Sequence, residues 1–585
     1  MIKLLKNFER KQWIYIIFAI IFVLLQVYLD LKIPDFMSEI TTLVQTGGTT
    51  NDILNVGIHM LICALGSLLF SVIVGYIIAT NGSIFSKNIR SKLFNKVSSF
   101  GMEEIRKFNT SSLITRTTND VSQVEILITM GLQMLLKAPI TAVWAIMKII
   151  GKNYTWSIIT GGAVFILITF VIILMLIAIP RFKRIQKLID SVNELTRENL
   201  KGIRVIRAFN AERFQESKFE GVNKTLTNTQ MFTQKIMGLM SPMMYMIMNG
   251  VSLCIYFFGC FMIDKALISA RIEIFSNMII FSSYATQVIM SFLVLTFIFV
   301  MYPRAAVSIE RINEVLDTKE KIKNGKLKES HSKGEVEFKN VSFKYPDSEE
   351  YMLKNISFKA SKGETVAIIG STGSGKSTLI NLIPRFYDVT EGEILVDGVN
   401  IKKLDLSYLN DKIGYVSQKA AIFTGSVKDN VNYGEKENYT ISEDKIKEAI
   451  KVAQAEDFVL KMDKKYDSSL SEGGTNISGG QKQRISIARA IARDPEIYIF
   501  DDSFSALDYK TDSILRNELK KYTKDATNKI VAQRIGTIMN ADKIIVLDKG
   551  NLVGIGKHKE LLKNCEVYKQ IAYSQLSKEE LSHEW

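Results

Sequence analysis

The first half of the chain is dominated by long stretches that contain no charged residue. A helix needs about 20 apolar residues to cross a bilayer, and five stretches come close to this length or exceed it: 13–29, 58–80, 156–180, 236–263 and 274–303. A sixth stretch, 130–150, is weaker because Lys137 and Lys148 interrupt it. The pattern therefore predicts five membrane-spanning helices and a candidate for a sixth.

The basic residues between these stretches predict their orientation. Residues 81–129 carry seven Lys and Arg and residues 181–235 carry twelve, whereas residues 34–53 carry none. Because basic loops stay in the cytosol, and because five spans would place one large basic loop on the wrong side, we include the sixth. This interpretation predicts a multi-pass protein of the cell membrane with both termini cytosolic. The two basic loops are long and helical in pattern, so the spans are expected to continue as helices into the cytosol.

The two ends of the membrane region have their own signals. The opening MIKLLKNFERK before an apolar run could be a signal peptide, but no small-residue cleavage site follows, so 1–12 is interpreted as an interfacial helix. The domain organisation predicted is then a membrane domain over 13–303, a basic linker over 304–334 and an α/β domain over 335–585.

Composition narrows the functional classes. Of the 585 residues 47% are apolar, which excludes a disordered chain. The four cysteines lack C-x-x-C spacing, which excludes a disulfide scaffold and a zinc ribbon. The net charge of +14 would suit nucleic acid, but the basic residues follow the membrane topology. We therefore expect the protein to interact with a lipid bilayer and not with nucleic acid.

A phosphate-binding loop lies early in the α/β domain. The run Gly370, Ser371, Thr372, Gly373, Ser374, Gly375, Lys376, Ser377, Thr378 fits G-x4-G-K-[ST], between an apparent strand and an apparent helix. Its glycines would let backbone N–H groups converge on phosphates, Lys376 would neutralise them, and Ser377 would ligate Mg²⁺. By itself the motif does not separate kinases, GTPases and transport ATPases.

Two further motifs follow the phosphate-binding loop. The apolar run 496–500 ends at Asp501 and Asp502, the arrangement by which Asp501 would hold Mg²⁺ through water. Between the two sites, Asn476 to Arg484 opens a helical segment. Its serine and glycines could be an ordinary N-cap. A second anion-binding helix N-terminus makes better sense if it faces a nucleotide held by another subunit.

In this order the motifs resemble those of ATP-binding cassette (ABC) transporters. Their signature matches Ile477, Ser478, Gly479, Gly480 and Gln481, and other matches are Tyr345 in VSFKYP, Gln418 in IGYVSQ, and Ser505, Ala506, Leu507 and Asp508 after the acidic strand. Six spans before one nucleotide-binding domain is the layout of a half-size exporter of this family. The segments 112–125 and 198–214 look like its two cytosolic coupling regions.

The resemblance implies roles for these residues. Tyr345 would stack on adenine, and Gln418 would sense the γ-phosphate and Mg²⁺. Two nucleotide-binding domains would sandwich two ATP molecules, each held between the phosphate-binding loop of one chain and the signature of the other.

Two positions depart from the family pattern. The family places Glu directly after the strand aspartate, where this chain has Asp502, and a switch histidine where this chain has Gln533. One methylene less withdraws the carboxylate by about 1.3 to 1.5 Å, and a displacement of about 1 Å can lower a rate about a hundredfold. None of the four histidines, at positions 59, 331, 558 and 583, lies in that loop. Glutamine can donate a hydrogen bond but cannot become cationic.

The pattern predicts the degenerate-site half of a heterodimeric multidrug-type ABC exporter. Its own ATP site would hydrolyse poorly, and its intact signature would complete the site of a second half-transporter that carries Glu and His. Alternatives are a homodimer with a slow ATPase, an importer of metal chelates with the same fold, and an ATP-gated sensor or channel that does not pump.

The membrane helices offer weak indications of a small amphipathic cargo. Met237, Met240, Met244 and Met248 recur at helical spacing, and Ser283, Thr286, Gln287 and Met290 share one face of the sixth span. The polar residues of this second face could equally line a cavity or form hydrogen bonds between helices. Thioethers suit a surface that adapts to varied apolar ligands, although ordinary packing explains the methionine face at least as well. The predicted spans contain no Asp or Glu that could serve a proton relay. ATP is therefore the expected energy source.

Overall fold

The chain divides into two compact units. The computed structural model describes residues 8–150, 154–330, 333–434 and 441–576. The first unit, here called the membrane unit, comprises the described residues up to Ser98 and from Thr110 to Thr318. The second, the α/β unit, comprises 99–109 and the described residues from Lys319 onward.

The membrane unit is built from long helices. In chain order these are α2 (Arg10–Thr46), α3 (Thr50–Ser98), α5 (Thr110–Thr115), the π-helical η1 (Arg116–Asp120), α6 (Val121–Ile126), the π-helical η2 (Leu127–Gly131), α7 (Leu132–Ile149), α8 (Tyr154–Ala208), α9 (Glu212–Gly238), α10 (Met240–Lys265) and α11 (Ile268–Asp317). Six helical rods of the described residues are long and apolar enough to cross a membrane, one for each predicted span, which confirms the six-helix prediction.

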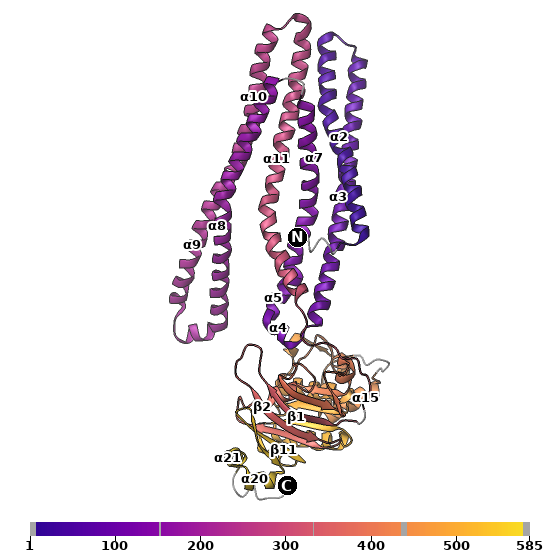
Figure 1. The fold of residues 1–585 in the computed structure, drawn as a ribbon, viewed down its shortest axis with the longest axis vertical. Coiled ribbons are helices and arrows are strands. Elements are labelled where there is room, and N and C mark those ends of the chain that lie inside the picture. Colours follow the sequence, from indigo (N-terminus) through magenta and orange to yellow (C-terminus); the bar gives the residue numbers. More distant parts are fainter. Residues whose placement is uncertain (1–7, 151–153, 331–332, 435–440, 577–585) are drawn as a thin grey trace. The chain divides into compact units, whose positions relative to one another are not determined.

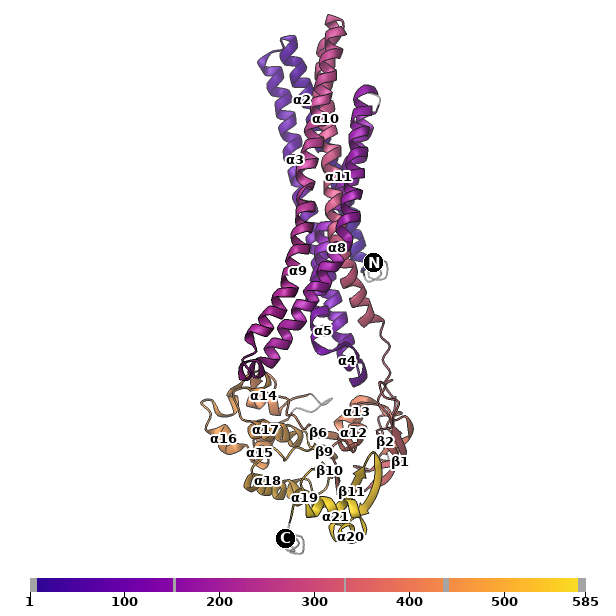
Figure 2. The same cartoon turned by 90° about the vertical axis from the view of Figure 1, so that its left-hand side faces the viewer.

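Several helices far exceed the length that a bilayer requires. Helices α3, α8 and α11 have 49, 55 and 50 residues, against about 20 for a span. Helix α9 lies beside the C-terminal part of α8 (Figure 1, Figure 2). The predicted helical character of the two basic loops is therefore confirmed.

The first helix differs from its predicted bounds at both ends. Most of the interfacial helix expected over 1–12 lies outside the described residues, and Arg10 already begins α2. At the other end α2 continues past the predicted limit of the span, with Asp30 and Asp35 inside the helix. Both carboxylates are paired with lysines of α7, which offsets part of the cost of placing a charge there.

The methionine face belongs to the core of the membrane unit. Met240 and Met244 are 9% and 2% exposed, and Met237 and Met248 pack against the same buried cluster. Their neighbours there include Trp156 and Phe281. Burial of Met240 and Met244 therefore supports the packing explanation of this face, and a cargo role of the four methionines stays a prediction.

The α/β unit contains two main sheets. Its strands are β1 (Val336–Phe343), β2 (Leu353–Ala360), β3 (Thr365–Gly370), β4 (Glu391–Val396), β5 (Val399–Asn400), β6 (Ile413–Val416), β7 (Gly425–Ser426), β8 (Ser469–Leu470), β9 (Ile497–Asp501), β10 (Thr527–Val531), β11 (Lys543–Asp548) and β12 (Asn551–Gly556). The larger sheet has the order β12-β11-β3-β10-β9-β6, parallel except for β12, and the antiparallel sheet has the order β2-β1-β4-β5.

Helices surround these sheets. They are α4 (Met102–Phe108), α12 (Lys376–Asn381), α13 (Leu406–Asp411), α14 (Val427–Val431), α15 (Glu443–Val452), α16 (Glu456–Leu460), α17 (Gly479–Ala492), α18 (Tyr509–Tyr522), α19 (Ile535–Ile538), α20 (His558–Asn564) and α21 (Glu566–Tyr573), with short 3₁₀ turns at Lys465–Asp467 and Glu472–Gly474. The predicted fold class, a helical membrane domain joined to an α/β phosphate-loop domain, is confirmed.

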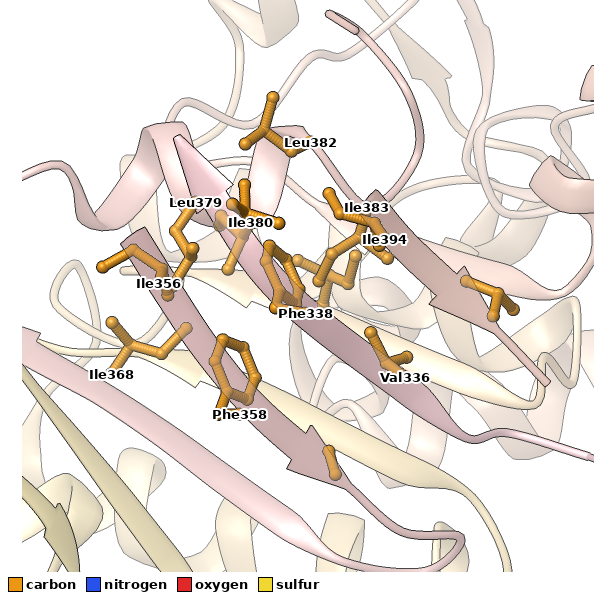
Figure 3. Close-up of a cluster of buried hydrophobic side chains, with 14 of the residues drawn as sticks. Val336, Phe338, Ile356, Phe358, Ile368, Leu379, Ile380, Leu382, Ile383 and Ile394 are labelled. Atoms are coloured by element: carbon orange, nitrogen blue, oxygen red, sulfur yellow. The ribbon is translucent and has the colours of Figure 1, made fainter. Parts of the chain in front are cut away.

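One hydrophobic cluster joins the antiparallel sheet to α12 and to the larger sheet. Figure 3 shows Phe338 of β1 and Phe358 of β2 facing the side chains of α12. The two phenyl rings stack with their centroids 4.6 Å apart. Because α12 directly follows the phosphate-binding loop, this cluster fixes the position of that loop.

The expected linker over 304–334 consists of two different structures. Its first part is helical, because α11 continues to Asp317. Its second part is docked on the α/β unit: the Asp405 N–H donates to the Leu327 carbonyl at 2.9 Å. A Cβ on Gly325 would lie 2.2 Å from the Leu404 carbonyl oxygen, so glycine permits this close approach. The segment is therefore not a free tether.

Lys529 of β10 is fully buried without a hydrogen-bond partner for its Nζ among the described residues. Burial lowers the pKa of Lys529 to about 7, against about 10.4 in an unfolded chain. Between these values the unfolded state binds more protons than the folded state. Stability contributed by this residue therefore rises with pH from about 7 to about 10.

Replacing this lysine by an apolar side chain of similar length should stabilise the protein. We expect Lys529→Met to raise the free energy of unfolding at pH 7 by about 2 to 4 kcal/mol, because no charge is then desolvated. Denaturation of the full chain at pH 7 and pH 10 measures this, with the exposed Lys521→Met as control. The advantage of Lys529→Met should shrink at pH 10; an advantage independent of pH would contradict the account.

Candidate nucleotide site

The phosphate-binding loop connects β3 to α12, as its sequence predicts. Gly373 and Gly375 have φ angles of +81° and +97°, which side chains other than glycine rarely adopt. At Gly370 a Cβ would lie 2.1 Å from the Leu547 carbonyl oxygen. The Oγ of Ser374 is buried without a partner in the described part of the chain. The loop is thus a backbone cradle with an unused polar group, which fits a phosphate.

Lys376 and Ser377 stand at the start of α12 with their polar atoms held in place. The Lys376 Nζ donates to the carbonyls of Gly370 and Ser371 at 2.9 and 2.8 Å. Burial lowers the pKa of Lys376, and the carboxylates of Asp502 and Asp501 oppose that shift. Two carbonyls therefore hold the ammonium, and a phosphate would be a stronger partner for it.

A divalent cation fits beside this loop. The Ser377 Oγ donates to Oδ1 of Asp501 at 2.9 Å, which joins the two expected Mg²⁺ ligands. Burial raises the pKa of Asp501, and the nearby Asp502 carboxylate raises it further. The described residues contain no cluster of three or more His, Cys, Asp or Glu for a metal. This donor set suits Mg²⁺, which proteins hold through one or two carboxylates together with nucleotide phosphates; the ion would neutralise phosphate charge.

Tyr345 lies against the phosphate-binding loop. Its hydroxyl is 2.9 Å from the Thr378 Oγ1, and its ring packs edge-on against Tyr387. The guanidinium of Arg106, on α4, lies 5.7 Å from the centroid of the Tyr345 ring. The aromatic residue expected to stack on adenine is thus beside the loop, in contact with a helix that the sequence analysis did not single out.

Helix α4 is attached to the α/β unit by polar contacts. Lys321 forms an ion pair with Glu103, and its backbone N–H donates to Oε1 of Glu104 at 3.1 Å. The coupling segment predicted at 112–125 instead runs through α5, η1 and α6 of the membrane unit. The short MEEIRKF helix carries charges at both ends and no long apolar stripe, so its sequence gives no signal of where it packs.

Asp502 and Gln533 are brought together. The Gln533 Nε2 donates to Oδ2 of Asp502 at 2.9 Å, and the Gln418 Nε2 approaches the same oxygen at 3.4 Å. Burial raises the pKa of Asp502, and the hydrogen bond from Gln418 opposes this. The backbone of Asp502 is left-handed, with φ of 47°, a conformation that Asp tolerates better than most residues. The short carboxylate is therefore occupied by two side-chain amides.

The signature caps the N-terminus of α17. The Ser478 Oγ accepts from the Gln481 N–H at 3.3 Å, and Oε1 of Gln481 accepts from the Ser478 N–H at 2.9 Å, a capping box. A Cβ on Gly480 would lie 3.2 Å from the Ala506 carbonyl oxygen, whereas one on Gly479 would meet nothing within 4 Å. The serine and the glycines thus form an exposed helix start beside residues 505–508, the segment that matches the D-loop of the family.

The D-loop connects Asp502 to the next helix. The Ser505 Oγ donates to the Asp502 carbonyl at 2.9 Å, and Asp508 caps α18 by accepting from the Thr511 N–H at 2.9 Å. The loop therefore lies between Asp502 and the signature of the same chain.

Removing the phosphate-binding lysine should weaken nucleotide binding. We expect Lys376→Ala to lower the affinity of this chain's own site for ATP by at least about tenfold, because a buried phosphate charge loses its cation. Equilibrium binding of a fluorescent ATP analogue measures the change, with the exposed Lys362→Ala as control. Unchanged affinity would contradict the assignment of the loop.

Known proteins are similar to this chain in sequence and in fold. The family models described as ABC transporter transmembrane region and ABC transporter match residues 16–302 and 353–505. An uncharacterized ABC transporter ATP-binding protein of Mycobacterium tuberculosis is 36% identical over 558 residues, 93% of each chain. An ATP-dependent lipid A-core flippase of Haemophilus influenzae is 35% identical over 395 residues, 67% of this chain and 66% of the other.

A solved structure shares the fold. A bacterial Atm1-family ABC exporter with ATP bound aligns with a TM-score of 0.81 and 22% identity, over 97% of this chain and 99% of the other. Because the identity is only 22%, this likeness establishes the fold alone.

Proposed function

Because the chain belongs to the ABC transporter family, as a half-size exporter with an ATPase domain coupled to transport, we propose that it works as one half of a heterodimer. In this proposal its phosphate-binding loop, Asp501, Asp502 and Gln533 build an ATP site that binds Mg²⁺-ATP and hydrolyses it poorly. Its Ser478 and Gly480 complete the competent site of a different half-transporter, which carries Glu and His.

The contact between Gln533 and Asp502 carries the proposal. A general base must accept a proton from the attacking water, and it must reach that water. Asp502 is one methylene shorter than the family's glutamate, and its Oδ2 already accepts from Gln533 at 2.9 Å. Both substitutions, Asp502 and Gln533, therefore affect the carboxylate at position 502, whereas the phosphate-binding loop and the signature match the family pattern. A site that retains binding and loses hydrolysis fits this combination.

Topology and cargo follow the same proposal. Both termini and the α/β unit lie in the cytosol, and ATP drives export of an amphipathic compound across the cell membrane. Support for an amphipathic cargo comes from the similar proteins of Haemophilus influenzae, which are named as flippases of a lipid. The homodimer, the metal-chelate importer and the non-pumping sensor remain the outcomes against which this proposal is tested.

Purification of the native complex tests the pairing. The chain, tagged and isolated from its native membrane in mild detergent, should be accompanied by an equimolar second half-transporter. Recovery of this chain alone, as a homodimer, would contradict the heterodimer. ATP-dependent uptake of an amphipathic dye into inverted vesicles separates a pump from a sensor. Equal dye uptake with and without ATP would contradict ATP-driven transport.

A further inference from the structure

A cavity in the membrane unit is lined by residues of α2, η2, α7 and α11. These helices contact one another pairwise and lie side by side (Figure 1). The cavity has a volume of about 710 Å³, within the range of small-molecule sites. Much of its lining is apolar, including Ile33, Pro34, Met130, Met134 and Val294. Ser283, Gln287 and Met290 of the predicted cargo face also line it, whereas Thr286 and the four methionines of the core do not.

An ion pair lies on the wall of this cavity. The Lys137 Nζ is 3.2 Å from Oδ2 of Asp30, and the Ser67 hydroxyl donates to Oδ1 of the same aspartate. Asp30 and Lys137 are both lining residues. Charges within membrane-spanning helices are costly, and they commonly mark a functional site.

A second ion pair joins the same two helices and provides a comparison. Lys148 lies 2.9 Å from Oδ2 of Asp35, and the Tyr284 hydroxyl of α11 donates to Oδ1 of Asp35 at 2.6 Å. Neither Lys148 nor Asp35 lines the cavity. This pair fastens α2, α7 and α11 together, so a structural role accounts for it.

The two residues of the cavity ion pair, Asp30 and Lys137, differ in how many polar contacts they make. Oδ1 of Asp30 accepts a hydrogen bond from Ser67, and its Oδ2 lies in the ion pair with Lys137. Asp30 is the one partner of the Lys137 ammonium among the described residues, and an ammonium has three donors. The Lys137 side chain is 40% exposed, against 27% for Asp30. The amides of Gln133 and Gln287 line the same cavity and can also donate. The polar part of the site therefore offers mainly unused donors.

We propose that this cavity binds an amphiphile with an anionic head, a carboxylate or phosphate, whose charge is taken by Lys137 and whose apolar body lies against the methionine and aliphatic lining. The inference rests on the proposed transport function and specifies its substrate class. Asp30 pairs with the Lys137 ammonium and positions it when the cavity is empty. The head group belongs to a membrane lipid or to a free amphiphilic acid.

Binding of a charge-matched probe series tests this site. The native complex is placed in phosphatidylcholine nanodiscs without ATP and titrated with 11-(dansylamino)undecanoic acid, its methyl ester and the corresponding amine, after subtraction of partition into empty discs. The acid should bind at least about tenfold more tightly than the ester, because charge-assisted hydrogen bonds form only with the acid. Equal affinity of acid and ester, or tightest binding of the amine, would overturn the proposal.

Matched double variants assign the effect to Lys137. Lys137→Met with Asp30→Asn removes both charges, so that no unpaired charge remains to prevent folding, and should reduce the acid-to-ester ratio to about one. Lys148→Met with Asp35→Asn removes the comparison pair and should keep the ratio. Persistence of the preference in the first variant, or its loss only in the second, would overturn the site.

A change of lipid identifies the source of the head group. If discs containing phosphatidylglycerol displace the acid, an anionic lipid occupies the site; if they do not, the ligand is a free acid, and both results support an anion site. The binding is measured without ATP, so failure of the acid preference leaves the heterodimer untouched. The ATPase measurements use no probe, so a result that contradicts the heterodimer can be told apart from a result that contradicts the anion site.

Discussion

Ser478→Ala and Gly480→Asp in this chain are expected to lower the ATPase rate of the pair with its wild-type partner by about a hundred- to a thousandfold, while Asp502→Asn changes it little. The size follows from the loss of preorganised donors that hold the γ-phosphate in the transition state. In the proposed sandwich these donors act on the partner's nucleotide. Asp502, in contrast, faces a site that already hydrolyses poorly.

The local structure separates the possible causes of such losses. Ser478 caps α17, so Ser478→Ala also removes a helix cap at a cost of about 1 kcal/mol, and Ser478→Thr is the control that keeps the hydroxyl. At Gly480 a side chain comes close to the Ala506 carbonyl. Gly480→Ala therefore measures the steric effect, and the further loss in Gly480→Asp measures the repulsion between the new carboxylate and phosphate.

Steady-state ATPase of each variant, paired with the wild-type partner and corrected for folded protein, gives the comparison. If Asp502→Asn is the most damaging of the substitutions, this chain hydrolyses ATP at its own site and the proposed division of labour is wrong.

The second large effect is a gain of activity. The chain purified by itself should bind ATP but hydrolyse it near background, because both of its sites would use Asp502 and Gln533. Asp502→Glu combined with Gln533→His should raise the rate by about a hundredfold. The longer side chain recovers the reach of about 1.3 to 1.5 Å, and a displacement of about 1 Å can account for such a factor.

The two single variants serve as controls for the gain. Gln533→His alone leaves the carboxylate short, and Asp502→Glu alone leaves the amide of Gln533 in contact range, so each should recover less than the double variant. ATPase of the chain alone is the measurement. High activity of the wild-type chain by itself, or no gain in the double variant, would contradict the role assigned to these two residues.

The nucleotide site was predictable because most of its residues lie in short contiguous motifs. The spacing from Gly370 to Thr378 places glycines where left-handed backbone is required, and the structure has φ of +81° and +97° at Gly373 and Gly375. The acidic strand likewise ends where predicted, at Asp501. The pairing of Asp502 with Gln533 is long-range, but parallel β9 and β10 bring the strand ends together.

The membrane unit was predictable in outline and less so in detail. Uncharged stretches located the six spans, but a count of uncharged residues ended the first span at Leu29, before the two aspartates of α2. Lys137 weakened the third span in the sequence, and its pairing with Asp30 gives the reason it is tolerated there. Helical periodicity placed Met240 and Met244 on one face but could not tell whether that face meets a cavity or the core.

Single-turnover hydrolysis by the native pair tests the central claim most directly. The complex is loaded with one radiolabelled ATP at each of its two sites, freed of unbound nucleotide, started with Mg²⁺ and quenched in acid over time. The account predicts rapid conversion of half of the bound ATP to ADP, while the other half persists as ATP. Conversion of all bound ATP in one rapid phase would contradict a degenerate site in this chain.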